Sequence, residues 1–490
     1  MTHADRACIT FPFGLLAVVA CSSSSGPTAA PVPTRGEAGN DAGAIVASAG
    51  FIDVPPRDVT VHGNTVSITS TARMFVSFRP AATNPRTSPV VFLWNGYAAE
   101  IVRAFGTGPT GVSSAGIVTT NPAPLTSIAN LVYIDPRQSG YSYDLPPAGS
   151  PATPTAEDCS PEVFNEYVDA GDVLSVALAF LAAHPELEGP VYWMGESYGG
   201  VRLTWILTYL RGAWANVPYT DTTLAAAIAG THRSASLFAG QILLEAWVGG
   251  GPEADAIARV CLDPSVAADV AMSAGESCSG AGPCACADDL GMSLYNYTYT
   301  NAFETERETE AIAAHIDPAA AATLLGVALA DIPELAPAER SKGWKCLGPD
   351  STIPSEAALE SALGPLPSGQ VYYLDFSPLV PGKETGSPVT DWRTASTEAL
   401  AFVDNLHDVP ALLTHGLRDL VVPTTALAPA LGAAIGSGRI DTSKTDAIGV
   451  VYPDGERFVE VRDYTAAGHM ITMVQPTDFA ADFAAWMRAH

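Results

Sequence analysis

The feature that most constrains the fold is the hexapeptide GESYGG at residues 195–200. It follows the apolar run 191–194, which is typical of a buried strand, and precedes the apolar segment 201–207, which we interpret as a helix. A strand, a sharp turn and a helix around G-x-S-x-G predict a nucleophile elbow, whose tight turn excludes side chains at the flanking glycines. The elbow would lift the Ser197 hydroxyl above the sheet, beside a helix N-terminus that favours negative charge. Serine is a poor nucleophile at neutral pH, so this prediction requires a base and an orienting acid elsewhere in the chain.

Two residues nearer the C-terminus complete a predicted catalytic triad. Asp419 follows the apolar run 409–414, which we interpret as another buried strand, and His469 lies in a loop after a predicted hairpin. The order Ser197, Asp419, His469 is the order found in α/β-hydrolases. His469 would take the Ser197 proton and later protonate the leaving group, while Asp419 would fix the His469 tautomer. The competing candidates are three nearby acids, Asp404, Asp408 and Asp463, and His415, which we interpret as a packed loop residue rather than a base.

Short apolar runs alternate with helical patterns along the chain. Runs of this kind, buried on both faces, are typical of a central, mostly parallel sheet, and they lie at 90–94, 131–134, 191–194, 237–244 and 409–414. Helical spacing of apolar residues ends before Pro185 and recurs near the C-terminus, and turn residues predict hairpins within 59–78 and 448–461. We therefore expect an α/β fold of the α/β-hydrolase type, with helices on both faces of the sheet.

The segment 250–396 breaks this rhythm. It is rich in Ala, Glu and Asp and is predicted to be largely helical. We interpret it as a cap insertion over the carboxyl edge of the sheet, where caps usually shape the substrate cleft. A separate domain with its own role is the alternative. The hydrolase core would then comprise residues 51–249 and 397–490.

The N-terminal residues resemble an export signal. Residues 9–20 are mostly apolar but too few to span a bilayer, so we predict a signal peptide over residues 1–20. The sequence VVAC at 18–21 resembles a bacterial lipobox, in which Cys21 would carry the lipid and residues 21–50 would form a flexible tether. We expect an exported chain that is lipid-anchored at the outer membrane or the periplasmic face, or secreted, with membrane contact only through the anchor.

The charge balance limits the kinds of partner. With 24 basic and 52 acidic residues the formal net charge is −28, which argues against nucleic-acid binding because that requires a basic footprint. Hydrophobic residues make up 47% of the 490-residue chain, so a sizeable core is expected. Peptides or small acyl compounds are the expected substrates, and oligomeric state is left open.

Six cysteines remain after Cys8 and Cys21 are set aside. An even number in an exported chain favours disulfides, although six cysteines allow 15 pairings. The spacing fits no zinc pattern well, so no metal site is expected. The six are Cys159, Cys261, Cys278, Cys284, Cys286 and Cys346.

Five blocks of sequence resemble the serine carboxypeptidase family of α/β-hydrolases. The segment VFLWNG at 91–96 resembles the family's first core strand and its Asn-Gly turn, and NLVYIDPRQSGYSY at 130–143 is similar to its next block. GESYGG matches the family's nucleophile motif residue for residue, and the last two blocks match at DLVVP, 419–423, and AGHM, 467–470. The resemblance implies a cofactor-independent peptidase that removes C-terminal residues through an acyl-enzyme, usually at acidic pH.

The resemblance also implies roles for the residues around Ser197. In the family, the turn Asn-Gly and the Glu before the nucleophile bind the substrate's C-terminal carboxylate, and these positions are Asn95, Gly96 and Glu196 here. The backbone N–H groups of the oxyanion hole correspond to Tyr97 and Tyr198. Glu196 would have to be protonated to accept a second carboxylate. A purely structural role of Asn95 and Glu196 in the turn is the alternative.

One turn departs from the family, because NGYAA at 95–99 stands where the family has Asn-Gly-Gly-Pro-Gly. Three functions are therefore carried forward. The first is a serine carboxypeptidase, the second is an esterase or acyltransferase on small acyl substrates, and the third is a non-catalytic surface binding protein that keeps the fold. The presence of Ser197, Asp419 and His469 argues against the third.

Overall fold

The computed structural model describes residues 45–96, 102–113, 117–151, 153–155, 158–159, 163–233, 235–246, 248, 314, 317–346, 397–416 and 427–490. The proposed lipid-anchor residue Cys21, together with Tyr97 and Asp419, lies outside these ranges. The same holds for Cys261, Cys278, Cys284 and Cys286. The roles predicted for these residues therefore stay predictions.

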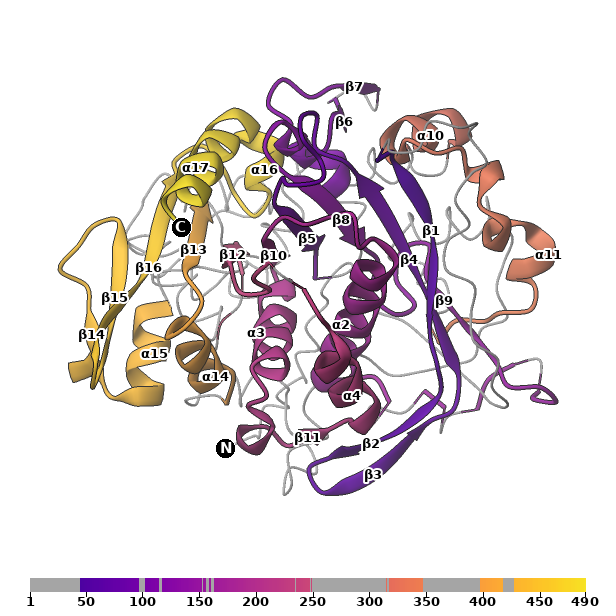
Figure 1. The fold of residues 1–490 in the computed structure, drawn as a ribbon, viewed down its shortest axis with the longest axis horizontal. Coiled ribbons are helices and arrows are strands. Elements are labelled where there is room, and N and C mark those ends of the chain that lie inside the picture. Colours follow the sequence, from indigo (N-terminus) through magenta and orange to yellow (C-terminus); the bar gives the residue numbers. More distant parts are fainter. Residues whose placement is uncertain are drawn as a thin grey trace, which may run out of the picture.

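A large twisted sheet forms the centre of the described fold (Figure 1). Its 11 strands run in the order β1 (Ser48–Val54), β4 (Thr71–Arg79), β8 (Asn130–Ile134), β5 (Val90–Trp94), β10 (Val191–Glu196), β12 (Gly240–Leu244), β13 (Ala411–Gly416), β16 (Gly455–Tyr464), β15 (Ala447–Tyr452) and β14 (Ile440–Asp441), with β9 (Tyr143–Leu145) paired to β4. Neighbouring strands from β8 to β16 are parallel, and the remaining pairs are antiparallel. The predicted mostly parallel sheet is thus confirmed.

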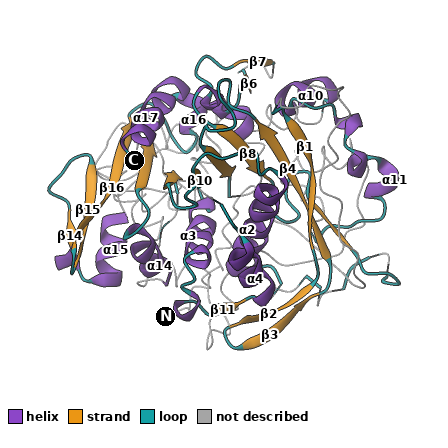
Figure 2. Cartoon of the chain, in the orientation of Figure 1, coloured by secondary structure: helices purple, strands orange, loops and turns teal. Residues whose placement is uncertain are grey.

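Alternation along the central strands creates two cores, one on each face of the sheet. Along β5, Phe92 and Trp94 point into one core and Val91 and Leu93 into the other, as the period of two in a strand requires. The first core is covered by α2 (Glu166–Ala183), α3 (Gly199–Leu210), α14 (Thr397–Leu406) and α15 (Leu427–Ile435). The second is covered by α16 (Ile471–Val474) and α17 (Pro476–Ala489), and η1 (Arg103–Thr107) packs beside these two helices. Helices on both faces were predicted, and Figure 2 shows them above and below the sheet.

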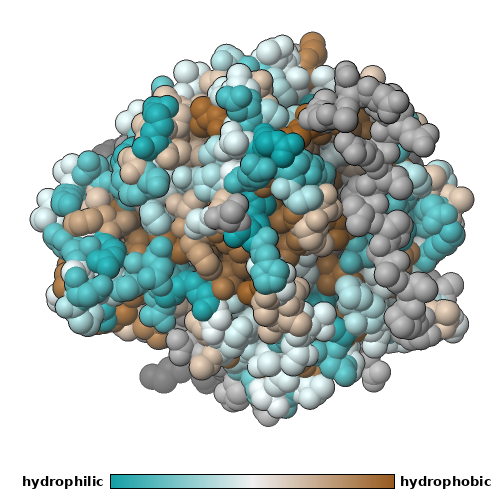
Figure 3. All heavy atoms as spheres, viewed as in Figure 1, coloured by the Kyte–Doolittle hydropathy of each residue, from teal (hydrophilic) through white to brown (hydrophobic). Residues whose placement is uncertain are grey.

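The remaining elements are a hairpin and several short helices and strands. The predicted N-terminal hairpin is confirmed as β2 (Arg57–Val61) and β3 (Asn64–Ile68), joined by a left-handed turn at His62 and Gly63. The short elements are α4 (Thr222–Gly230), β11 (Tyr219–Thr220), β6 (Thr110–Val112), β7 (Val118–Thr120), η2 (Leu125–Ser127), η3 (Trp214–Asn216) and η7 (Ser437–Arg439). On the face shown in Figure 3, hydrophilic residues dominate the rim. No helix in the described ranges has the length and apolarity needed to cross a bilayer.

The described part of the expected cap flanks one side of the sheet. It contains α10 (Pro318–Leu325), η4 (Leu329–Asp331), η5 (Pro333–Leu335) and α11 (Pro337–Arg340). In Figure 1, α10 and α11 lie beyond β1, where Leu325 and Leu335 share a core with Phe51 and Phe75. Arg79 at the end of β4 also donates to the carbonyl of Leu324 at 2.9 Å. The cap's predicted position over the carboxyl edge concerns residues that lie mainly outside the described ranges.

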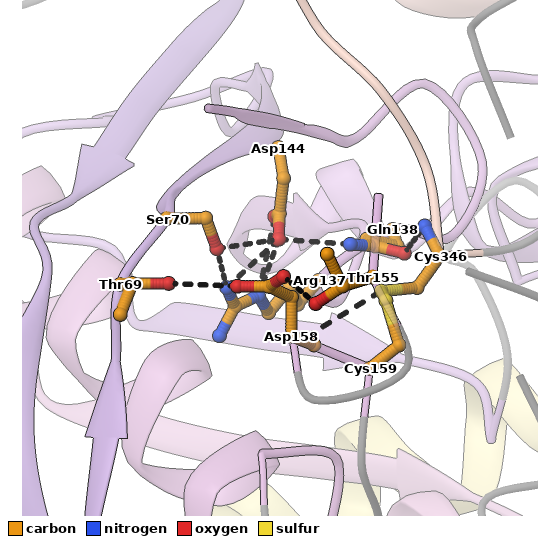
Figure 4. Close-up of a disulfide and its surroundings, with 9 residues drawn as sticks. All are labelled: Thr69, Ser70, Arg137, Gln138, Asp144, Thr155, Asp158, Cys159 and Cys346. Carbon is orange, nitrogen blue, oxygen red and sulfur yellow. Dashed lines mark hydrogen bonds and ion pairs between the residues drawn. A yellow bond between two sulfur atoms is a disulfide. The ribbon is translucent and has the colours of Figure 1, made fainter. Parts of the chain in front are cut away.

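A disulfide joins this part of the insertion to the core (Figure 4). Cys159 bonds to Cys346, 187 residues further along the chain, which confirms one predicted disulfide. Beside it, the backbone N–H of Cys346 donates to the side chain of Gln138, and Gln138 donates to Asp144 at 2.8 Å. Asp144 also forms a buried ion pair with Arg137 at 2.8 Å. The disulfide is therefore continuous with a buried polar network next to β9.

Candidate active site

A strained turn presents Ser197 between β10 and α3. Ser197 has φ 57°, in the left-handed region that few non-glycine residues adopt. A Cβ on Gly195 would lie 2.5 Å from the carbonyl carbon of Gly199, so this position excludes every residue other than glycine. The Ser197 N–H donates to Leu244 O at 2.9 Å, which ties the turn to the end of β12. The backbone has the geometry of the predicted elbow, while the nucleophilic role of Ser197 stays a prediction.

The second glycine of the elbow brings α3 against the end of β5. A Cβ on Gly199 would lie 2.9 Å from the indole ring of Trp94, and the Trp94 Nε1–H donates to Gly199 O at 3.0 Å. The turn that follows β5 is held beside the start of α3 by this contact. A Cβ on Gly96 would lie 3.3 Å from the backbone nitrogen of Tyr198, one of the two predicted oxyanion donors.

The proposed carboxylate-binding pair is in contact in the structure. The Asn95 Nδ2 donates to Glu196 Oε2 at 2.5 Å, which joins the turn after β5 to the residue that precedes Ser197. Both side chains are buried, with exposed fractions of 6% and 1%. Gly96 is buried beside them. The hydrogen bond from Asn95 supplies a partner for this buried side chain, because an isolated buried carboxylate is poorly tolerated.

His469 lies at the same edge of the sheet, in the loop after β16, and β12 and β13 separate β16 from β10. It is buried in the loop between β16 and α16. A Cβ on Gly416, the last residue of β13, would lie 2.7 Å from Ala467 O, so this loop packs directly against the end of β13. The sheet order β10, β12, β13, β16 therefore brings the Ser197 turn and the His469 loop to one edge. Asp419 follows Gly416 by three positions in the sequence.

Two of the three competing acids have other partners, and the third is exposed. Asp463 Oδ1 lies 3.0 Å from His415 Nδ1, and Asp408 forms an ion pair with Arg211 at 2.5 Å. Asp404 is exposed on α14. The prediction that His415 lies in a loop is wrong. The strand predicted at 409–414 is β13, which extends to Gly416, and His415 is a buried residue within it.

Three charged residues near the elbow were missed by sequence reasoning. Arg202 interrupts an otherwise apolar helical segment, and that interruption is the signal that could have found it. Its guanidinium forms an ion pair with Asp169 of α2 at 2.7 Å. Glu245 follows β12, has φ 43°, and accepts a hydrogen bond from the N–H of Gly416. Glu245 thus links the strand beside the elbow to the strand that supports the His469 loop.

Burial shifts the ionisation of the acids behind the elbow. Burial raises the pKa of Asp169, and the neighbouring Arg202 opposes the shift. Burial also raises the pKa of Glu166 well above 4.5, and the adjacent Glu398 carboxylate raises it further. The pKa of the Tyr198 hydroxyl is raised by burial and by Asp169. Burial is therefore the largest cause of each of these shifts, and the Arg202 cation opposes the shifts of Asp169 and Tyr198.

The raised pKa of Glu166 predicts a pH-dependent stability. In this case the folded state binds a proton more tightly than the unfolded state, so this contribution is complete below pH 4.5 and is lost as pH rises towards the folded pKa. We expect Glu166→Gln to gain stability relative to wild type as pH rises from 4.5 to 8, because the glutamine has no proton to lose. Urea unfolding at several pH values measures the difference. Glu188→Gln, at a half-exposed carboxylate, is the control, and a constant difference for Glu166→Gln would contradict the prediction.

Comparison with known proteins agrees with this geometry. The family model described as serine carboxypeptidase matches residues 56–210, about a third of the chain, and this range contains the Asn95 turn and the Ser197 elbow. Over this stretch the chain resembles the serine carboxypeptidases. The predicted resemblance is thereby confirmed there, and together with the strained Ser197 turn it supports a serine hydrolase.

Solved structures are more remote. The prohormone-processing carboxypeptidase Kex1(Δ)p from Saccharomyces cerevisiae aligns at 13% identity over 90% of this chain and 91% of its own, with a TM-score of 0.47. An esterase from Exiguobacterium antarcticum aligns at 12% identity over 85% of this chain and 96% of its own, with a TM-score of 0.33. No curated protein matches the chain. The serine carboxypeptidase resemblance is therefore carried by the matched N-terminal stretch and by the site itself.

Proposed function

We propose that the protein is a serine-type carboxypeptidase that hydrolyses C-terminal peptide bonds through an acyl-enzyme on Ser197. The observation that carries this proposal is the buried hydrogen bond between Asn95 and Glu196, directly beside Ser197. These are the two positions that bind the substrate's C-terminal carboxylate in the serine carboxypeptidases. Their contact supports a binding pair that is formed before substrate arrives.

The reaction would follow the established steps of a serine hydrolase. The Ser197 hydroxyl attacks the carbonyl carbon of the last peptide bond while His469 takes its proton. The N–H of Tyr198 and that of Tyr97 would stabilise the oxyanion of the tetrahedral intermediate. His469 then protonates the leaving amine, which departs as the free C-terminal amino acid. Water, activated by His469, cleaves the ester on Ser197 and restores the enzyme.

Recognition of a free carboxyl terminus gives the reaction a pH dependence. The substrate carboxylate and Glu196 are stable together only when Glu196 holds a proton, because two adjacent carboxylates repel each other. A protonated Glu196 can donate to the substrate while accepting from Asn95. We therefore expect cleavage of free acids to weaken as pH rises.

An esterase or acyltransferase acting on small acyl substrates is the second candidate. The sequence NGYAA at 95–99 favours it, because this turn differs from that of the carboxypeptidases at the residues that follow Gly96. Such an enzyme would keep Ser197 and His469 but would not depend on a substrate carboxylate.

A matched pair of substrates separates the two functions. One is an N-blocked dipeptide with a free carboxyl terminus and the other is its C-terminal amide, and both are assayed from pH 4 to 8. A carboxypeptidase should cleave the free acid at least about tenfold faster than the amide at pH 4 to 5, a discrimination of about 1.4 kcal/mol. In Glu196→Gln, which cannot ionise, the decline in free-acid cleavage with pH should disappear. If neither dipeptide is cleaved while a simple ester is, the peptidase assignment fails and the esterase is favoured.

A further inference from the structure

Arg202 makes an unusual set of contacts at the start of α3. Its Nη1 donates to the carbonyl of Asn95 at 2.8 Å, and its Nη2 donates to the carbonyl of Gly96 at 3.3 Å. Both carbonyls lie beyond the last residue of β5, where strand pairing has ended. Buried carbonyls in such a turn require donors from elsewhere, and a single guanidinium supplies both.

The Arg202 side chain is itself held in place. Its Nε donates to Asp169 Oδ2 at 2.7 Å, and its guanidinium lies 5.2 Å from the centre of the Tyr198 ring. Only 1% of Arg202 is exposed. The two backbone carbonyls, the Asp169 carboxylate and the Tyr198 ring therefore fix the planar guanidinium of Arg202. A flexible lysine would not reproduce these contacts.

These contacts converge on the place where negative charge develops in a serine hydrolase. A Cβ on Gly96 would lie 3.1 Å from the Tyr198 Cβ and 3.3 Å from the Tyr198 nitrogen, so the Gly96 backbone is next to a predicted oxyanion donor. Fixing the carbonyls of Asn95 and Gly96 therefore holds the Gly96 backbone in place next to Tyr198.

We propose that Arg202 is a positioning residue for the oxyanion site, which it orients by clamping the backbone of Asn95 and Gly96 while Asp169 holds it in place. The inference rests on the proposed serine hydrolase activity but not on the choice between peptide and ester. Arg202 touches no reacting atom in this scheme. Its effect is exerted through the turn, so loss of the clamp should weaken transition-state stabilisation more than substrate binding.

The test compares Arg202→Lys with Arg57→Lys. Arg57 is the control, because it is also a buried arginine in ion pairs, with Asp172 at 2.6 Å and Asp221 at 2.5 Å. Neither of these partners belongs to the elbow. The substrate is p-nitrophenyl acetate, and a simple alkyl trifluoromethyl ketone serves as a probe, because its adduct with Ser197 carries an oxyanion. Thermal unfolding of each variant shows how far the fold is affected.

We expect Arg202→Lys to lower kcat about 10- to 100-fold, less than the 10²- to 10³-fold loss when an oxyanion donor is deleted. KM should change less than about twofold, and affinity for the ketone should fall by the same factor as kcat. Arg57→Lys should lose stability but keep kcat. A kcat for Arg202→Lys close to wild type, or a change in KM alone, would overturn the proposal.

Two further outcomes are decisive. If Arg202→Lys does not fold, Asp169→Asn takes its place, because it keeps an oxygen for Arg202 but weakens the ion pair. A parallel fall of about threefold or more in kcat and ketone affinity supports the proposal, and an unchanged kcat refutes it. If the folded wild type neither hydrolyses the ester nor reacts with a fluorophosphonate at Ser197, the proposed hydrolase function fails and this inference fails with it.

Discussion

Ser197→Ala should lower kcat/KM for p-nitrophenyl acetate by roughly 10⁴-fold or more, the scale seen when a serine nucleophile is removed from a hydrolase. Ser197 stands at the tip of a turn with φ 57°, and alanine can adopt the same backbone at similar cost. Only the hydroxyl is lost. The large effect is therefore expected on the chemical step and not on the fold.

Steady-state kinetics and labelling with a fluorophosphonate probe test this expectation together. Ser175→Ala is a matched control, because Ser175 lies on α2 and its hydroxyl donates only to Gly171 O at 2.8 Å among the contacts seen. The control should keep its activity and its labelling. If Ser197→Ala retained labelling or more than about a tenth of the wild-type rate, another nucleophile would have to be sought; the ratio corresponds to only about 1.4 kcal/mol.

Gly195→Ala should have the second largest effect, although it adds a single methyl group. That methyl would lie 2.5 Å from the Gly199 carbonyl carbon, so the elbow must open to admit it. We expect a loss of about 1–3 kcal/mol in the free energy of unfolding, as for other overpacked sites. Because a misplacement of about 1 Å can cost about 100-fold in rate, activity should fall by at least that factor.

Urea unfolding and ester hydrolysis measure the two consequences separately. Gly230→Ala is the control, because a Cβ at the end of α4 meets no atom within 4 Å. Its stability should stay within about 0.5 kcal/mol of wild type. If Gly195→Ala matched Gly230→Ala in both measurements, the tight packing of β10 against α3 would not be the reason for glycine at this position.

Much of the fold could be predicted because its central strands are uninterrupted apolar runs. The run 90–94 coincides with β5, and the run 191–194 is extended to Glu196 in β10. Strand order could not be predicted in the same way. For example, β12 pairs with β13, although the whole insertion lies between these two strands in the sequence. Local periodicity does not encode pairing between segments so far apart.

The site could be predicted only where a residue carries its own local signal. Ser197 lies in a motif. The resemblance to the serine carboxypeptidases predicts Asn95 and Glu196, and these two side chains are hydrogen-bonded at 2.5 Å. Arg202 and Glu245 had no such motif. Their roles depend on a carbonyl or an N–H that is more than 100 residues away in the sequence, and only the folded chain brings these groups together.

The insertion separates β12 from β13 in the sequence, and this affects how the protein folds during its synthesis. Thr414 on β13 donates to Leu243 on β12, although the two residues are 171 positions apart. Closing a loop of that length costs roughly 4–5 kcal/mol of chain entropy, and contacts this remote slow folding. The growing polypeptide would carry Ser197 long before β13 and the His469 loop are synthesised. In the proposed mechanism, a chain still under synthesis lacks a complete site until the polypeptide has passed His469, so hydrolysis would begin only when synthesis is almost finished.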